Sequence, residues 1–245
     1  MIVIIGTGHV FDLSKAIKNI LDNEKPDVIA VELDQKRYTA LLTRKNNPSE
    51  YRKYAKDQPF VYRLLSKFQE GVAGKYGVQP GEEMLTAIKY AQNQQLPVDF
   101  VDKDAQKIFK KMVKSMSFTE KIRLFLNAIA SIFIRKKDVE KEIDKIEENL
   151  EEYLKGIQKK FPTIKKVLID ERNQYISDKL KKMNENFDKI VAILGDGHIP
   201  GIEKMIRKED IEIKTIRLKQ LKEKQNFLSK NSSYSANIQF EYRPP

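Results

Sequence analysis

The chain has 245 residues, one third of them charged, and a formal net charge of +11. It contains no cysteine, which excludes disulfides and thiolate zinc sites and leaves histidine and carboxylate side chains as the available metal ligands. No apolar run reaches the roughly 20 residues that span a bilayer. The N-terminal "MIVIIG" lacks the basic segment of a signal peptide, so we expect a cytoplasmic protein. Nucleic acid is not an expected partner, because no recognition-helix or RNA-binding pattern accompanies the basic residues.

The first elements in chain order are a strand, a helix and a second strand. Residues 2–5 ("IVII") and 28–33 ("VIAVEL") are short apolar runs typical of buried strands. Residues 11–23 between them have the spacing of an amphipathic helix. We expect this unit to be a right-handed crossover that joins two parallel strands.

The rest of the chain continues the alternation of helices and strands. A mostly helical region, a third strand, a long helical region, a fourth strand and an alternating edge strand follow at residues 35–95, 98–101, 104–186, 190–194 and 211–218. The sequence therefore predicts an α/β fold, with a mixed, partly parallel β-sheet flanked by helices.

The long helical region predicts an insert in the α/β domain. We expect one domain over residues 1–218, a helical insert at about 105–160, and a polar tail over 219–245 in which 237–242 could add a strand. Residues 118–137 are apolar in the middle and basic at both ends, which permits contact with a membrane surface.

A second part of the insert carries a stripe of apolar residues at spacings of three and four. The stripe consists of Val139, Ile143, Ile146, Leu150, Leu154 and Ile157. Such a stripe is typical of a helix that packs on another helix. It predicts burial within the insert or in a homodimer that forms through the insert.

The chain has two histidines, and both occupy the same local pattern. His9 in "GTGH" and His198 in "GDGH" each follow an apolar strand. Ligands bind at the carboxyl ends of strands in open parallel sheets, so we expect the two histidines to share one cleft. Glu32 ends the second strand and Asp102 follows the third, which places both carboxylates at the same edge. We expect the motif glycines to permit positive-φ turns and a close approach to the backbone.

Two imidazoles and one carboxylate form a common ligand set for a catalytic divalent metal ion. The set favours Mn²⁺, Co²⁺ or Zn²⁺ over Mg²⁺ and Ca²⁺. Paired histidines can also act as acid, base or anion ligands, so this alternative stays open. Glu32 lies in an otherwise apolar strand, and its burial would require a partner such as a metal ion or Arg37. Exposure at the strand end is the alternative for Glu32, and also for Asp102.

Five segments together resemble the TraB/PrgY family of pheromone-shutdown proteins, which is related to the Tiki metalloproteases. They are "GTGHV", "KPDVIAVELDQKRYTALL", "GVQPGEEMLTAIKYA", "DERNQYISDKL" and "GDGHIPGI", in this order between residues 2 and about 205. One departure is Lys103, where the family commonly has an arginine. Lysine lacks the planar fork of arginine, so Lys103 is not included in the site.

The resemblance implies a metal-dependent peptide hydrolase that degrades or inactivates a signalling peptide. Its metal-binding and catalytic groups would be His9, His198 and Glu32, with Arg37 and Arg172 orienting the substrate. Both arginines could instead form structural salt bridges. Further candidates are Asp102, Glu171 and Glu83, although "GEE" is also an ordinary start of a helix. Two alternatives to hydrolysis are a non-enzymatic, peptide-sequestering protein and a membrane-surface adaptor.

Overall fold

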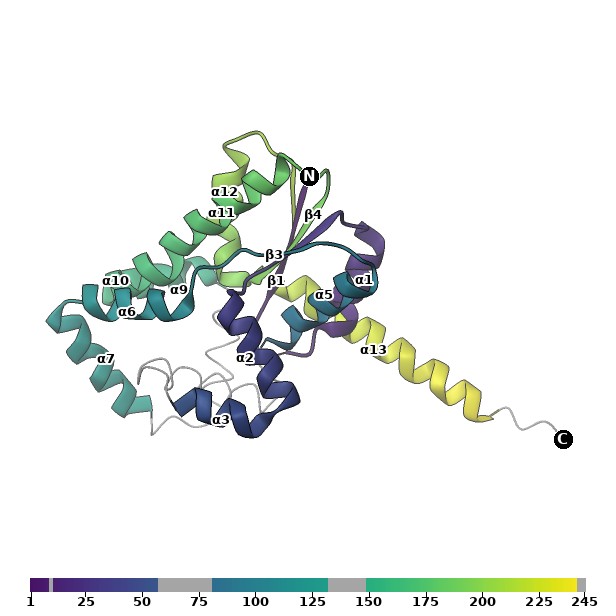
Figure 1. The fold of residues 1–245 in the computed structure, drawn as a ribbon, viewed down its shortest axis with the longest axis horizontal. Coiled ribbons are helices and arrows are strands. Elements are labelled where there is room, and N and C mark those ends of the chain that lie inside the picture. Colours follow the sequence, from purple (N-terminus) through teal and green to yellow (C-terminus); the bar gives the residue numbers. More distant parts are fainter. Residues whose placement is uncertain (9–10, 57–80, 132–148, 242–245) are drawn as a thin grey trace.

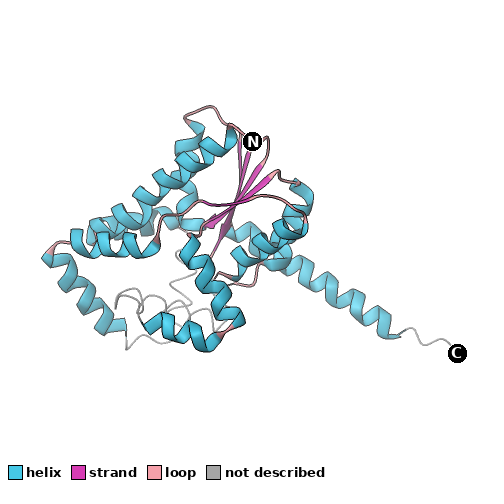
Figure 2. Ribbon diagram, in the orientation of Figure 1, coloured by secondary structure: helices cyan, strands magenta, loops and turns pink. Residues whose placement is uncertain are grey.

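The computed structural model describes residues 1–8, 11–56, 81–131 and 149–241. Five strands of this part form one sheet: β1 (Ile2–Thr7), β2 (Val28–Val31), β3 (Val98–Phe100), β4 (Ile190–Gly195) and β5 (Ile213–Ile216). The helices are α1 (Ser14–Glu24), α2 (Gln35–Asn46), α3 (Pro48–Lys56), α5 (Glu82–Asn93), α6 (Ala105–Ser115), α7 (Phe118–Ser131), α9 (Leu150–Lys160), α10 (Pro162–Lys165), the π-helix η1 (Lys166–Asp170), α11 (Glu171–Asn184), the 3₁₀ turn η2 (Asp196–His198), α12 (Ile199–Arg207) and α13 (Leu218–Glu241). Figure 2 shows the helices arranged around the central sheet.

The strand order in the sheet is β3-β2-β4-β1-β5, and the pairings between these strands are all parallel. The predicted α/β class is confirmed, and the sheet is more regular than the mixed sheet that we expected. The alternating pattern at 211–218 indicated an edge strand, and β5 is one, but this pattern carries no information on strand direction. The direction follows from α12, which crosses the sheet between β4 and β5 and returns the chain in the same sense.

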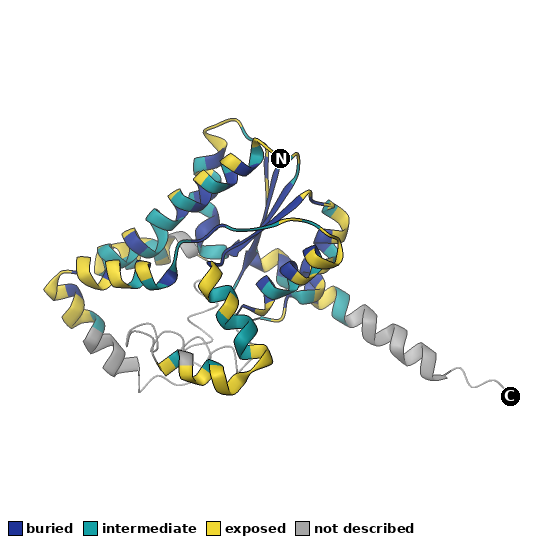
Figure 3. Cartoon of the chain, viewed as in Figure 1, coloured by how far each residue is buried: buried dark blue, intermediate teal, exposed yellow. Residues whose placement is uncertain are grey.

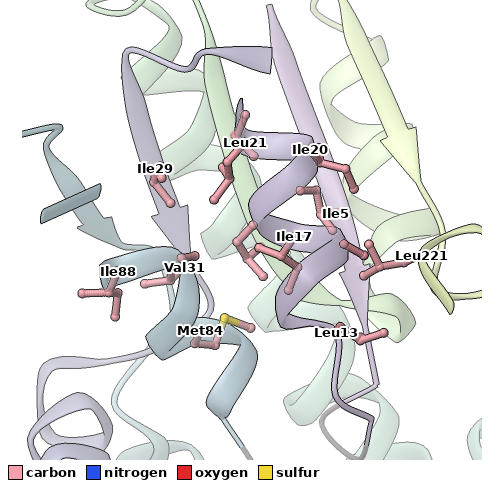
Figure 4. Close-up of a cluster of buried hydrophobic side chains, with 14 of the residues drawn as sticks. Ile5, Leu13, Ile17, Ile20, Leu21, Ile29, Val31, Met84, Ile88 and Leu221 are labelled. Atoms are coloured by element: carbon pink, nitrogen blue, oxygen red, sulfur yellow. The ribbon is translucent and has the colours of Figure 1, made fainter. Parts of the chain in front are cut away.

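Alternate residues of each strand point to opposite faces of the sheet, and each face has its own apolar core. On one face, Ile5 and Val31 pack with residues of α1, α5 and α13, among them Ile17, Met84 and Leu221 (Figure 4). On the other face, alternate positions of the same strands pack against α11 and α12 (Figure 1). Burial on both faces explains why β1, β2 and β4 are continuous apolar runs.

The region after residue 218, for which we expected a polar tail, forms helix α13. The prediction of a strand at 237–242 is wrong for residues 237–241, which are helical. Leu221 is fully buried, and the Oε1 atom of Gln225 accepts a hydrogen bond of 2.8 Å from the backbone N–H of Ala16. That N–H lies in the first turn of α1, where backbone donors have no partner within the helix. Leu13, the N-cap of α1, makes no side-chain cap hydrogen bond, so α13 completes the start of α1.

The described part of the predicted insert is helical and consists of α6, α7 and α9. Helix α9 ends at Lys160 and α10 begins at Pro162, so the helix break that we expected near Pro162 lies at Phe161. Leu154 of the apolar stripe is half-buried, whereas 139–146 lie outside the described residues. The stripe, the homodimer and the domain boundaries therefore stay predictions. Within the described residues, we find no helix with the length and apolar character needed to cross a membrane.

Candidate functional site

The two glycine-histidine motifs follow neighbouring strands. Thr7 at the end of β1 pairs with Gly195 at the end of β4. The chain leaves β1 towards β2 through α1 on one face, and leaves β4 towards β5 through α12 on the other face. Ligand-binding crevices form where successive connections diverge in this way. His198 lies in η2 at this point, whereas His9 lies outside the described residues.

Glu32 is a buried carboxylate at the carboxyl edge of the sheet, with 3% of its surface exposed. Its Oε2 atom accepts a hydrogen bond of 2.5 Å from the backbone N–H of Gly195, and Oε1 accepts one from Nη2 of Arg172. A carboxylate is costly to bury unless it is paired and hydrogen-bonded. Two elements that lie far from β2 in the chain, β4 and α11, therefore stabilise the charge at the end of β2.

His198 lies beside Glu32, with Nε2 at 3.5 Å from Oε1. Its other ring nitrogen, Nδ1, is 2.6 Å from Oδ1 of the buried Asn173. An amide oxygen only accepts hydrogen bonds, so Nδ1 carries the proton in this assignment of the Asn173 amide. In the neutral form of the ring, Nε2 then carries a lone pair, which can take a proton or bind a metal ion.

Arg172 joins the carboxylates of Glu32 and Asp102. Its Nε and Nη2 atoms contact Oδ1 and Oδ2 of Asp102 at 2.9 and 2.8 Å, in a bidentate pair. Burial by itself would lower the pKa of Arg172, but the charges of Glu32 and Asp102 outweigh it and raise that pKa above its ordinary value. Arg172 therefore stays charged and holds the two carboxylates together. Arg37 adds a second contact to Asp102, at 3.5 Å, from a half-exposed side chain.

The structure thus brings together five of the predicted site residues, Glu32, Arg37, Asp102, Arg172 and His198.

The remaining described candidates have other surroundings. Glu171 forms an ion pair of 2.6 Å with Lys111 of α6, and no bond to Glu32, Asp102 or His198 is seen among the described residues. Glu83 is buried in the first turn of α5.

Asn173 is a site residue that the sequence analysis missed. It follows Arg172 in "DERN", and the motif itself indicates no contact with a histidine. The contact arises because α11 packs against α12. Gly201 of "GHIPG" makes room for it: an added Cβ at Gly201 would lie 3.1 Å from Cγ of Asn173, and closer still to Nδ2.

The expectation that the motif glycines adopt positive φ is wrong for those that the structure describes, because the one described glycine with positive φ is Gly81, which lies outside both motifs. Close approach is the role that the structure supports at Gly6 and Gly8, whereas a Cβ at Gly197 would meet no atom of the described residues within 4 Å. A Cβ at Gly6 would collide with the carboxylate of Asp196 and with Cδ1 of Ile199. Asp196 in turn binds Arg217 through both carboxylate oxygens, at 2.8 and 2.6 Å, and ties the end of β4 to the end of β5.

The distance between Glu32 and His198 is compatible with two ligands of one divalent metal ion. Two ligands of a tetrahedral zinc ion, with bonds of about 2.1 Å, lie about 3.4 Å apart, close to the 3.5 Å between Oε1 and Nε2. The described residues contain no group of three His, Asp or Glu side chains arranged to hold a metal ion. A third ligand would have to come from elsewhere, and the sequence offers His9.

Comparison with known proteins places the chain in a family. The chain is 29% identical over 249 residues to an uncharacterized protein of Methanocaldococcus jannaschii, an alignment that covers 97% of this chain and 62% of the relative. It is 26% identical to the TraB domain-containing protein of Homo sapiens and 27% to that of Mus musculus, over 83% of this chain and 62% of each relative. The chain thus spans about three fifths of the length of the curated relatives that it matches. The model of the TraB/PrgY/gumN family matches residues 1–215, and the chain belongs to this family.

Proposed function

We propose that this chain is a divalent-metal-dependent peptide hydrolase whose site lies at the carboxyl edge of the sheet. The observation that carries the proposal is the buried contact between Glu32 and His198, 3.5 Å apart between the ends of β2 and β4. A carboxylate beside an imidazole can hold a metal ion and can move a proton. Both abilities serve the addition of water to an amide.

The metal ion would be held by Glu32 and His198, with His9 as the proposed third ligand. When bound, such an ion lowers the pKa of its water and polarises the carbonyl of the substrate. Imidazole ligands favour Mn²⁺, Co²⁺ or Zn²⁺.

Protein groups around Glu32 and His198 have supporting roles in the proposal. Gly195 N–H orients the Glu32 carboxylate, and Asn173 orients the His198 ring. Arg37 is half-exposed beside Asp102, so its guanidinium can bind a substrate carboxylate or a developing oxyanion. The resemblance to PrgY pheromone-shutdown proteins and Tiki metalloproteases supports a peptide as substrate. By analogy, that peptide would be a signalling peptide.

A peptide library read by mass spectrometry tests the proposal. Tag-free chain would be incubated with the library after chelation and after addition of Mn²⁺, Co²⁺ or Zn²⁺. We expect cleavage that depends on the metal ion, and a loss of about 10²- to 10⁴-fold in Glu32→Gln and in His198→Ala, as is typical of acid–base groups. Glu171→Gln is the matched control, because Glu171 pairs with Lys111. Cleavage that survives chelation, or falls equally in the control, would contradict the proposal.

A non-enzymatic peptide-binding protein is the second candidate. It is favoured by the bonds of Glu32, since Arg172 and Gly195 each engage one of its two oxygens. Glu32, Asp102, Arg37 and Arg172 also have formal charges that sum to zero, so a divalent ion would add two positive charges to a balanced cluster. Peptides that the chain retains on a column and releases uncleaved, with or without metal ions, would support this candidate over hydrolysis.

A further inference from the structure

Large apolar side chains are exposed where α6 meets α7. Val113 is 37% exposed, Phe118 77% and Ile122 44%. Phe118 and Ile122 are four residues apart on α7 and therefore share one face of that helix. Exposed apolar side chains that gather on one surface mark candidate interaction sites. We call this region, residues 107–122, the α6–α7 corner; it lies on the left in Figures 1 and 3.

The same corner is basic. Its exposed lysines are Lys107, Lys110, Lys111, Lys114 and Lys121. Its single acidic residue, Glu120, is buried, and its carboxylate accepts hydrogen bonds from Ser117 and Thr163. The exposed surface of the corner thus combines apolar side chains with lysines and has no exposed carboxylate of its own.

We infer that the α6–α7 corner docks on an anionic membrane surface. Charge complementarity selects this occupant, because lysines at an interface attract anionic headgroups while their stems and the neighbouring apolar side chains reach the acyl boundary. A second copy of the chain fits less well, since a symmetric contact would bring the same lysines together. A nucleic acid would use the lysines but has no need for Phe118 and Ile122.

Helix α6 connects the corner to the candidate site. Its first N–H, at Ala105, donates to Oδ2 of Asp34, the N-cap of α2, and Lys111 pairs with Glu171 beside Arg172. The 11 residues of α6 span about 16 Å at 1.5 Å per residue. A docked corner would therefore hold the carboxyl edge of the sheet close to the membrane. The inference stands whether or not that edge hydrolyses peptides.

Cosedimentation with sucrose-loaded vesicles tests the inference. The full chain would be mixed with vesicles of phosphatidylcholine alone or with one third phosphatidylserine. We expect binding to the anionic vesicles that weakens at high salt, where charges are screened. Phe118→Ser with Ile122→Ser should lower the partition coefficient about tenfold or more, through the loss of apolar burial. Lys110→Gln with Lys114→Gln should lower it about fivefold for each lysine.

Matched controls lie elsewhere on the surface. Phe227→Ser removes a phenyl ring that is 63% exposed on α13, and Lys15→Gln with Lys18→Gln removes two exposed lysines of α1. We expect both controls to bind as the wild type does, and circular dichroism would verify that every variant is folded. Wild-type protein that does not bind anionic vesicles would overturn the inference. Binding that is unchanged in Phe118→Ser with Ile122→Ser but is lost in the lysine variant would also overturn it, because it indicates a general polyanion-binding surface. A dimer in sedimentation velocity that the apolar double variant abolishes would overturn it as well.

Discussion

Asn173 accepts a hydrogen bond from Nδ1 of His198, and the backbone of Gly201 leaves room for its amide. The three residues come from α11, η2 and α12, and together they determine which nitrogen of the imidazole faces Glu32. Gly201 thus leaves the space in which Asn173 can orient the His198 ring.

Loss of this arrangement should change the tautomer of His198. In a His9→Ala background one imidazole remains, and its ¹⁵N shifts report the protonated nitrogen. We expect the Nδ1–H form to predominate, and Asn173→Leu or Gly201→Ala to reduce its preference about two- to tenfold, the value of one hydrogen bond. Gly156→Ala is the control, because nothing lies within 4 Å of a Cβ at Gly156. An unchanged tautomer in folded Gly201→Ala would refute this role of Gly201.

Arg172 is the residue on which the buried charges depend most. Its removal leaves Glu32 and Asp102 buried without their shared cation, and breaking a buried pair in this way typically costs about 3–5 kcal/mol. We expect that loss in the free energy of unfolding of Arg172→Gln. Mn²⁺ or Zn²⁺ should raise its melting temperature more than that of the wild type, because a divalent ion replaces the lost charge.

Arg207→Gln provides the comparison for Arg172→Gln. Arg207 pairs with Glu203 on the surface of α12, with a side chain that is 59% exposed, and should contribute about 0.5 kcal/mol or less. Equal losses in the two variants would mean that the buried cluster contributes no more than a surface pair. Equal effects of metal ions on wild type and Arg172→Gln would mean that the ions bind elsewhere.

At the scale of elements, the contacts between helices place the site residues. The π-helix η1 precedes α11 directly, and Nη1 of Arg172 donates to the carbonyl of Leu168 within it, at 3.3 Å. π-helical turns occur often at functional sites. Here the turn forms one of the supports of the Arg172 guanidinium.

Glu120 connects α7 of the insert to α10, which follows the insert. Its carboxylate accepts hydrogen bonds from Ser117 at the start of α7 and from both the N–H and the hydroxyl of Thr163 in α10. Glu120→Gln replaces one acceptor oxygen by a donor that faces other donors. We expect a loss of about 1–3 kcal/mol in urea unfolding at pH 7. Glu152→Gln, at an exposed cap of α9, should lose much less; a similar loss would show that Glu120 is no more than a surface cap.

At the scale of the whole molecule, several carboxylates make the fold sensitive to acid. Hydrogen bonding to Lys214 is the main cause that lowers the pKa of Glu24. In Asp104 and Glu120 burial would raise the pKa, but hydrogen bonds outweigh it and lower the pKa. These groups bind fewer protons in the folded state than in the unfolded state. Their contribution to stability is complete above their ordinary pKa values of 3.8 and 4.5 and is lost as the pH falls below them.

Urea unfolding across pH 7 to pH 3 measures this sensitivity. We expect little change in the free energy of unfolding above about pH 5.5 and a progressive loss below pH 4.5. Glu120→Gln should reduce the loss, because the titrating group is gone. A free energy that rises on acidification, or a slope that Glu120→Gln leaves unchanged, would contradict the assignment.

The sequence by itself determined the local elements of the fold. Apolar runs of four to six residues predicted β1, β2 and β4, because strands that are covered on both faces of the sheet carry apolar side chains on both faces. The alternation at 211–218 predicted the exposed edge at β5. Glu32 and His198 were found because each interrupts or follows such a run, and parallel strands bring their carboxyl ends to one edge.

Tertiary structure alone decided what these elements contact. Contacts between residues far apart in the chain determine the strand order, the direction of β5 and the docking of α13 on α1. The hydrogen bond from His198 to Asn173 spans a shorter separation, of 25 residues, between α11 and the start of α12. Periodicity describes which side of an element is apolar, but not which element covers it or which neighbouring helical residue faces a partner. That information depends on the packing of whole faces. Arg172 was expected at the site because of the family resemblance, whereas neither the resemblance nor the periodicity indicated Asn173, one position further along.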